Sequence, residues 1–256
     1  MIYYRNGKTY CERSGGIRLR RNFNITFLIL IVVLLSNAFR RGAFSDPMNW
    51  LMGELMMLPG IIIGLAFHEF AHAAVAFKLG DPTPKMQGRV TINPLAHIDP
   101  VGLAALLFAG FGWGVPVQIN PSNFKKRRRD ELLVSLAGVT MNLVIAIVFA
   151  IVAKILYMTM GPSFLSGSVG SILWMMIMYV IQINLVLMIF NLIPCPPLDG
   201  FSIISEIFNI KHTEIYWTLY RYGDWILIAL IIFGITGRII SPCVNFLFGI
   251  LSSFII

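Results

Sequence analysis

Charged residues are scarce in this chain of 256 residues, and no long polar stretch separates its apolar runs. Asp, Glu, Lys and Arg make up 12% of the chain, whereas about a quarter of an average soluble domain is charged. Hydrophobic residues account for 57%, and the mean hydropathy is +0.78. This composition excludes a disordered tail, a collagen and an ordinary soluble enzyme. It predicts an integral membrane protein built as one embedded unit.

Cysteine is also scarce, and acidic residues are outnumbered by basic ones. The three cysteines, Cys11, Cys195 and Cys243, have no spacing typical of a disulfide framework or of a C-x-x-C site. Against 12 acidic residues stand 20 Lys and Arg, which give a net charge of +8. Because the basic residues cluster beside apolar runs, they follow the positive-inside pattern of membrane proteins. We therefore expect no nucleic-acid partner.

Apolar runs that are long enough to cross a bilayer predict about five to six transmembrane helices. Four of these runs are continuous: 23–39, 50–78, 131–157 and 169–193. The last apolar stretch, 225–256, is interrupted at Ser241-Pro242 and is expected to form one kinked helix or a short hairpin. Residues 194–224 are polar enough for a loop with a short amphipathic piece. We therefore predict an all-α polytopic membrane protein.

The stretch after the second run predicts a different kind of element. Residues 88–100 (GRVTINPLAHIDP) combine a short β-prone piece with Pro, Asn and Gly, and 101–116 is apolar but short and rich in glycine. Such a segment is typically re-entrant, or β-like and packed between helices. The basic run 125–129 that follows is expected to be a solvated cytoplasmic loop. A site for a lipid phosphate is the alternative.

The distribution of basic residues predicts the orientation in the membrane. If the N-terminus is cytoplasmic, segments 1–22, 78–129 and 194–224 face the cytoplasm. They then carry six, eight and two Lys and Arg residues, or 16 of the 20. This asymmetry favours a multi-pass protein with its N-terminus inside.

The most informative residues lie inside the second apolar run, as His68-Glu69-Phe70-Ala71-His72. Two histidines four residues apart share one face of a helix and can bind one metal ion. The Glu between them can act as a general base towards water activated by that ion. Ionisable residues inside an apolar span are costly and mark functional sites. The pattern therefore predicts a zinc centre in this helix.

A catalytic zinc needs a third protein ligand besides its water. Asp199 is best placed, because it follows a helix that is unwound by three prolines near the depth expected for the histidines. A carboxylate on non-helical backbone within a membrane is tolerated only where it lines a cavity. The candidates for the third ligand are Asp199, Glu206, Asp99, His97 and Cys195.

Together these motifs resemble a known family. Residues 191–200 (NLIPCPPLDG) look like the N-x-x-P-x-P-x-x-D-G motif of the site-2 protease family of intramembrane zinc metalloproteases, and HEFAH matches its H-E-x-x-H motif. The stretch 88–100 and the later FGWG-x-PV-x-INP-x-x-F…RRD resemble its short bacterial members, which lack PDZ and CBS domains. The resemblance covers roughly residues 60–200.

The resemblance implies one Zn²⁺ per chain, bound by His68, His72 and Asp199, with Glu69 as the catalytic base. It also implies a catalytic role for Asn142, which matches the last residue of the family's A-G-P-x-x-N motif and would hold the substrate or the oxyanion. An interhelical hydrogen bond is the alternative for Asn142.

Two further features of this region follow from the resemblance. Val139 stands where the family usually has Pro. His97 and Asp99 are implied to lie in a re-entrant strand or loop whose edges align an extended substrate. The alternatives for His97 are a competing metal ligand and a polar residue that stabilises the loop.

The implied activity is hydrolysis of peptide bonds within or near transmembrane segments, that is, regulated intramembrane proteolysis in a bacterial plasma membrane. Single-span membrane proteins in the lipid bilayer are the expected substrates, and their helices must unwind locally, because an intact helix hides its carbonyls in hydrogen bonds. We expect residues 1–256 to form a single metalloprotease domain, with a cytoplasmic segment 1–22 and a catalytic core over 60–200. The alternative is a non-catalytic zinc-binding membrane protein, such as a chaperone or a transporter.

Overall fold

A computed structural model describes residues 2–5, 8–11, 39, 44–109 and 112–256. These residues form two compact units, which are described separately. The predicted first transmembrane helix over 23–39 lies outside the described residues, apart from its last position.

The first unit comprises Met1–Trp50 and Pro100–Trp113. Strands β1 (Ile2–Arg5) and β2 (Lys8–Cys11) pair as an antiparallel hairpin within the basic N-terminal segment. The apolar stretch that was predicted to be too short for a span forms helix α4 (Pro100–Ala109), which is 10 residues long. At about 1.5 Å per residue, α4 covers only half of a bilayer's hydrocarbon core.

Helix α2 (Pro47–Lys78) leads into the second unit, which comprises Leu51–Asp99 and Gly114–Ile256. It contains 32 residues, so it is about 48 Å long. The helix ends before Gly80, whose φ of +107° is a conformation that favours glycine. This agrees with the predicted end of the second apolar run.

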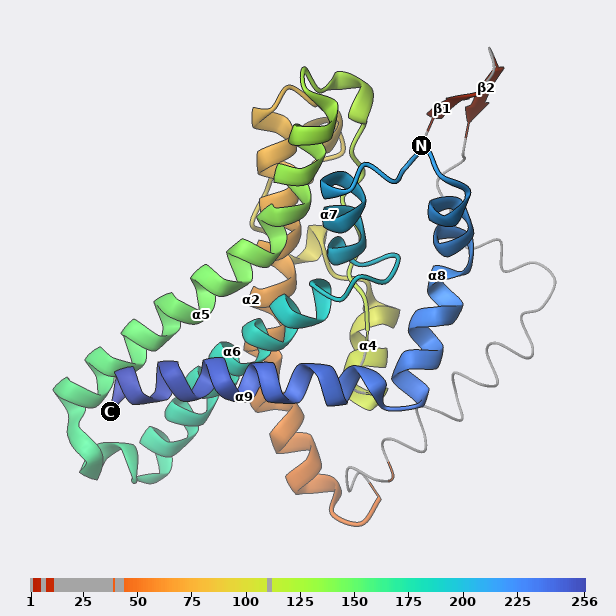
Figure 1. The fold of residues 1–256 in the computed structure, drawn as a ribbon. Helices are drawn as coiled ribbons and strands as arrows, with labels where there is room; N and C mark the ends of the chain where they lie inside the picture. Colours follow the sequence, from red (N-terminus) through yellow and green to blue (C-terminus); the bar gives the residue numbers. More distant parts are fainter. Residues whose placement is uncertain (1, 6–7, 12–38, 40–43, 110–111) are drawn as a thin grey trace. The chain divides into compact units, whose positions relative to one another are not determined.

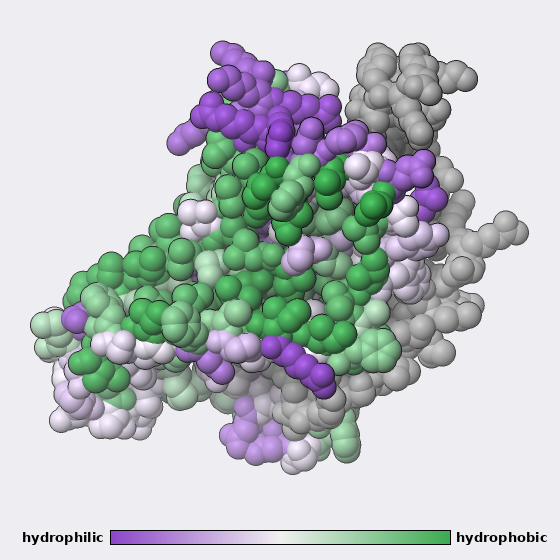
Figure 2. Space-filling model, viewed as in Figure 1, coloured by the Kyte–Doolittle hydropathy of each residue, from purple (hydrophilic) through white to green (hydrophobic). Residues whose placement is uncertain are grey.

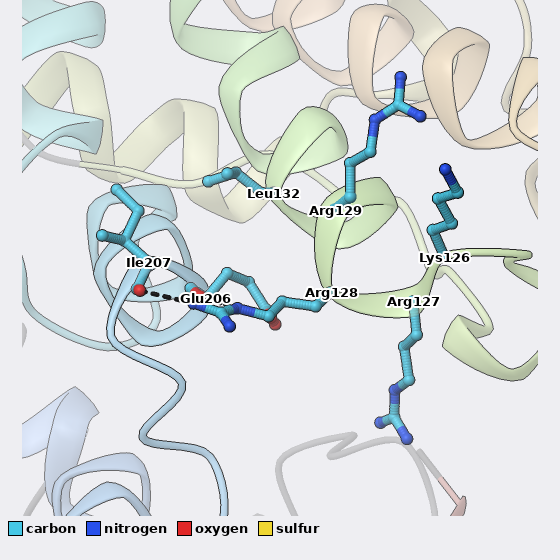
Figure 3. Close-up of a pocket in the computed structure, with 7 residues that line it drawn as sticks. All are labelled: Lys126, Arg127, Arg128, Arg129, Leu132, Glu206 and Ile207. Atoms are coloured by element: carbon cyan, nitrogen blue, oxygen red, sulfur yellow. Dashed lines mark hydrogen bonds between the residues drawn. The ribbon is translucent and has the colours of Figure 1, made fainter.

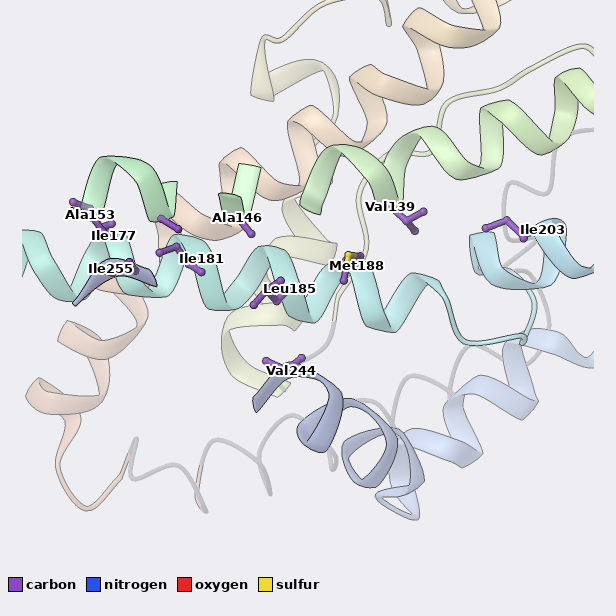
Figure 4. Packing of buried hydrophobic residues seen from close by; sticks show 11 residues of the cluster. Val139, Ala146, Ala153, Ile177, Ile181, Leu185, Met188, Ile203, Val244 and Ile255 are labelled. Atoms are coloured by element: carbon purple, nitrogen blue, oxygen red, sulfur yellow. The ribbon is translucent and has the colours of Figure 1, made fainter. Parts of the chain in front are cut away.

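Three long helices of the second unit pack around one apolar core: α5 (Arg127–Leu165), α6 (Ser168–Asn191) and α9 (Ile235–Ile255). Alanines at 146, 150 and 153 of α5 are fully buried in this core, and such small residues allow helices to approach closely. Figure 4 shows the cluster, which comprises Val139, Ala146, Ala150, Ala153, Ile177, Ile181, Leu185, Met188, Ile203, Val244 and Ile255.

Within the described part of the chain, four helices are long and apolar enough to cross a membrane, namely α2, α5, α6 and α9. Large side chains such as Val144, Ile147 and Ile151 are exposed on α5, as expected of a surface that faces lipid. Figure 2 shows this hydrophobic surface over the long helices, and hydrophilic residues gather where α2 ends and α5 begins. The predicted all-α polytopic membrane protein is confirmed.

The last apolar stretch forms the end of α8 (Glu214–Ile232) and all of α9 (Figure 1), so the hairpin alternative is correct. The first part of α8 lies within 194–224, so the loop predicted there was wrong from Glu214 onward. The predicted position of the break was wrong. The chain turns at Gly234, which has φ +68°, whereas Ser241-Pro242 lies inside α9. A helix in a membrane tolerates a proline where its neighbours compensate for the lost hydrogen bond, whereas a left-handed residue ends the helix.

The shorter elements partly agree with the predictions. The amphipathic piece is α7 (Asp199–Ile207). The segment 88–100 contains no strand; it follows α3 (Thr83–Met86), includes the 3₁₀ turn η1 (Pro94–Ala96) and forms a single β-bridge from Ile98 to Gly114. After the turn η2 (Pro121–Asn123), the basic run already enters α5 at Arg127, so its second half is helical rather than a loop.

Candidate metal centre

Three side chains from distant parts of the chain meet at one point. His68 and His72 lie one turn apart on α2, and their Nε2 atoms are 3.0 Å apart. Asp199, the first residue of α7, places Oδ2 at 3.2 Å from Nε2 of His68 and 3.3 Å from Nε2 of His72. Ligands at about 2.0–2.1 Å from a tetrahedral Zn²⁺ are about 3.3 Å from one another. The three separations therefore fit one zinc ion bound by all three side chains.

The burial of these atoms supports the same fit. The side chains of His68 and His72 are buried, and Oδ2 of Asp199 is buried without a hydrogen-bond donor. A buried carboxylate oxygen of this kind is unfavourable unless a cation or a donor satisfies it. A divalent metal ion at this point would satisfy the carboxylate and both imidazoles together.

The other ring nitrogen of each histidine is held by a neighbour on α5. Nδ1 of His72 lies 2.7 Å from the carbonyl oxygen of Val134, which can only accept, so Nδ1 carries the proton. Nδ1 of His68 lies 2.6 Å from Oδ1 of Asn142. Both arrangements leave the Nε2 lone pairs to a metal ion, as is usual for histidine ligands.

Asn142 is fully buried, and its side chain contacts a histidine rather than an open cleft. This contact is the interhelical hydrogen bond given above as the alternative for Asn142, and its role towards a substrate stays a prediction. Helix α5 continues without a break through Val139, where the resembling family usually has Pro.

Gly138 is a residue of this site that the sequence reasoning missed. A Cβ atom at this position would lie 2.4 Å from Nε2 of His72 and 2.7 Å from Nε2 of His68. Any side chain here would fill the space that the two imidazoles need. The available signal was its place in the stretch Ala137-Gly138-Val139, which corresponds to the A-G-P of the family motif.

Glu69 is half-buried between the two histidines and is held by a segment far along the chain. Its Oε2 accepts a hydrogen bond of 3.0 Å from the N–H of Val117. Two residues earlier, the N–H of Val115 donates to the carbonyl of His97 at 2.7 Å. The extended segment 114–118 thus connects the 88–98 loop to the candidate base.

Just beyond this segment, the chain is held by Asp81. The Asp81 carboxylate is fully buried and accepts hydrogen bonds from the hydroxyl of Thr83, the N–H of Asn120 and the side-chain amide of Asn123. Burial raises the pKa of this carboxyl, but the donors outweigh burial and hold the pKa below its usual range. Asp81 therefore ties the end of α2 to the segment that reaches Glu69.

The remaining candidates for the third ligand lie elsewhere. His97 is fully buried, and its Nε2 bonds to the carbonyl of Thr91 at 2.8 Å, which is the loop-stabilising arrangement. Glu206 pairs with Lys211, and Sγ of Cys195 lies 3.4 Å from the carbonyl of Pro196. Asp99 is not part of the cluster either. Within the described residues, the group with metal-ligand geometry is His68, His72 and Asp199.

Helix α7, which carries Asp199, is held at both ends. At its start, a Cβ on Gly200 would lie 2.3 Å from the carbonyl oxygen of Leu192, so the helix abuts the end of α6. At its end, the guanidinium of Arg128 donates to the carbonyls of Glu206 and Ile207 at 2.6 and 2.7 Å (Figure 3). A cation that caps the last carbonyls stabilises a helix.

An ionic cluster lies beside this cap. The ammonium of Lys211 pairs with both Glu131 and Glu206, and Arg127 pairs with Glu131 at 2.8 Å. Burial raises the pKa of Glu206, and Lys211 opposes that shift. A surface cavity of about 510 Å³ adjoins the cluster, and its basic side chains point in different directions in Figure 3. They therefore do not converge on one anion.

Comparison with known proteins gives consistent results. The model of Peptidase family M50 matches residues 154–233, which include Asp199. The chain is 39% identical over 189 residues to "Putative zinc metalloprotease YwhC" of Bacillus subtilis (strain 168), and the alignment covers 72% of this chain and 84% of the relative.

More distant relatives carry similar names. "Putative zinc metalloprotease Rip2" of Mycobacterium tuberculosis (strain ATCC 25618 / H37Rv) is 28% identical over 180 residues, covering 64% of this chain and 65% of the relative. The protein of the same name from Mycolicibacterium smegmatis is 25% identical over 213 residues, covering 80% and 79%. No solved structure matches the chain significantly.

Proposed function

The chain belongs to Peptidase family M50, and we propose that it is an intramembrane zinc metalloprotease of the site-2 type. It hydrolyses peptide bonds within or near transmembrane segments of single-span membrane proteins. The observation that carries the proposal is that Asp199 of α7 meets His68 and His72 beside Glu69 on α2, a helix apolar enough to cross a membrane.

The roles of the site residues follow from this geometry. His68, His72 and Asp199 would hold the Zn²⁺ through Nε2, Nε2 and Oδ2. When bound, the zinc supplies Lewis-acid activation of water and of the substrate carbonyl. Glu69 takes the proton of the attacking water and gives it to the leaving amine. Its Oε2 faces the N–H of Val117, so the other carboxylate oxygen carries the proton.

The position of the site in α2 limits the substrates. His68 and His72 precede Lys78 by ten and six residues, which is about 9–15 Å along a helix. We propose that Lys78 marks the cytoplasmic end of the span in a plasma membrane, as the basic segments indicate. Substrate helices must then unwind at this depth to expose a carbonyl, so segments weakened by Gly, Pro or Asn are preferred.

The proposal is tested by measuring zinc content and cleavage together. We expect about one zinc per wild-type chain and cleavage of a single-span substrate that a chelator abolishes. Glu69→Gln retains zinc and loses cleavage, whereas Asp199→Ala loses zinc. Glu214→Gln, an exposed position at the start of α8, is the matched control and retains both. If the wild type binds no zinc, or Glu69→Gln still cleaves, the chain is not a zinc protease of this kind. Zinc binding without cleavage favours the non-catalytic alternative.

A further inference from the structure

A chain of hydrogen bonds runs from His68 through two buried amides into a third helix. Oδ1 of Asn142 on α5 bonds to Nδ1 of His68 at 2.6 Å, and Nδ2 of Asn142 donates to Oδ1 of Asn184 on α6 at 3.0 Å. Nδ2 of Asn184 donates in turn to the carbonyl of Val180 at 2.8 Å. We refer to His68, Asn142 and Asn184 as the amide relay.

Two backbone carbonyl groups fix the orientation of the two amides in this relay. The carbonyl oxygens of Val180 and Gly64 can only accept, and they receive hydrogen bonds from Nδ2 of Asn184 and Nδ2 of Asn142. Each amide therefore turns its oxygen towards the preceding member of the relay. The oxygen of Asn142 faces His68, so Nδ1 of His68 is the protonated nitrogen and Nε2 is free for a metal ion.

Packing leaves the two amides little freedom to turn. Asn142 and Asn184 are fully buried, and both are enclosed by membrane-spanning helices. At Gly64 of α2, a Cβ would lie 3.2 Å from Oδ1 of Asn184, so the glycine admits this side chain against α2. The two N–H bonds of the Asn142 amide are both used, one on Gly64 and one on Asn184. Removing either acceptor leaves a buried donor without a partner.

We propose that Asn184 is a positioning residue of the metal centre, which acts through Asn142 to hold His68 in the metal-binding tautomer. The inference rests on the proposed zinc site and adds a residue outside the family motifs that the sequence matches. Asn184 contacts neither the ligand atoms nor Glu69. Its effect on the metal passes through the orientation of the Asn142 amide. If that amide turned over, it would present a donor to Nδ1 of His68, and the tautomer with a free Nε2 would lose its support.

The test compares variants of position 184 in the full-length protein in detergent, with zinc affinity measured by chelator competition. Asn184→Leu removes the acceptor but keeps a side chain branched at Cγ, and it is expected to lower zinc affinity about tenfold, the lower end of the range for outer-shell partners. Asn184→Asp in its protonated form retains an acceptor for Asn142 and a donor for the carbonyl of Val180, so it is expected to stay within about threefold of the wild type. Gln182→Leu makes the same kind of change at an exposed position of α6 and should have no effect.

A second readout follows the histidine itself. The chain has four histidines, so magnetic resonance of isotope-labelled imidazoles in the zinc-loaded protein can resolve them. The Nδ1–H of His68 is expected to exchange slowly with water in the wild type and faster in Asn184→Leu. The Nδ1–H of His72 is bonded to Val134 instead, so it provides an internal reference that the substitution leaves unchanged.

Each outcome decides between the readings. A tenfold loss in Asn184→Leu, with Asn184→Asp and Gln182→Leu near the wild type, supports the relay. Equal zinc affinity in Asn184→Leu and wild type overturns it while leaving the zinc site intact. If Asn184→Leu does not fold, the exchange rate of the Nδ1–H of His68 in the wild type still tests the relay. Rapid exchange of this proton with water contradicts the relay. A wild type that binds no zinc refutes the proposed function itself.

Discussion

Substitution of Gly138 by Ala tests the metal centre with the smallest possible change. The added Cβ would lie 2.4 Å from Nε2 of His72 and 2.5 Å from Cε1 of His68, whereas ordinary contacts begin at 3.4 Å. The imidazoles or α5 must therefore move by about 1 Å, a displacement that costs about a hundredfold in rate when it affects catalytic geometry. We expect zinc affinity to fall at least about tenfold and cleavage to fall about a hundredfold.

The magnitude of the stability change separates this effect from general damage. Alanine is favoured over glycine inside a helix by about 1 kcal/mol, and overpacking costs about 1–3 kcal/mol, so the zinc-free protein should lose at most about 2 kcal/mol. The assay is chelator competition for zinc together with thermal unfolding of the zinc-free protein. Gly249→Ala on α9, where a Cβ meets nothing within 4 Å, is the control and should bind zinc normally. Undiminished zinc affinity in Gly138→Ala would refute the geometry of the site.

Three further predictions concern the supports of the site. Because hydrogen bonds hold the pKa of Asp81 below its unfolded value, its carboxylate stabilises the fold above about pH 4, and this contribution is lost as the pH falls through the lowered pKa. Unfolding measured against pH should therefore depend less on acid in Asp81→Asn, and an unchanged dependence would contradict the assignment. Arg128→Gln removes the cap of α7 and should lower both the melting temperature and the free energy of unfolding, the latter by about 1 kcal/mol. Arg129→Gln, at an exposed neighbouring position, should leave the melting temperature unchanged. Equal melting temperatures of the two variants would argue against the cap. Val117→Pro removes the N–H that bonds to Glu69 and should slow cleavage about tenfold with zinc content unchanged, and full activity would show that this bond is dispensable.

Much of the metal centre could be predicted because its signals are local in the sequence. His68 and His72 share a helix face by their spacing alone, and the prolines before Asp199 mark the point where α6 has to end. The long apolar runs likewise predicted α2 and α6 to within three residues at each end, because each run is bounded by Gly, Pro or charged residues. The run 131–157 predicted α5, but the observed helix begins four residues earlier and ends eight residues later.

The rest depends on contacts between distant segments, which periodicity cannot reveal. The periodicity of α5 and α6 does not mark Gly138 or Asn184 as part of the site, because their contacts with α2 and with each other's neighbours form only in the folded chain. The break in the last apolar stretch was predicted at Ser241-Pro242 because proline disfavours a helix interior, but the chain turns at Gly234, which adopts the left-handed conformation that the turn requires. The bond from Val117 to Glu69 joins residues 48 positions apart and has no local signal.

The position of the cut in a single-span substrate tests the central claim most directly. Incubation with the wild type, followed by mass spectrometry of the products, should reveal new termini within or at the edge of the substrate's transmembrane segment. The same incubation with Glu69→Gln should yield none. New termini confined to the substrate's soluble parts, or identical products from both proteins, would contradict intramembrane proteolysis by this site.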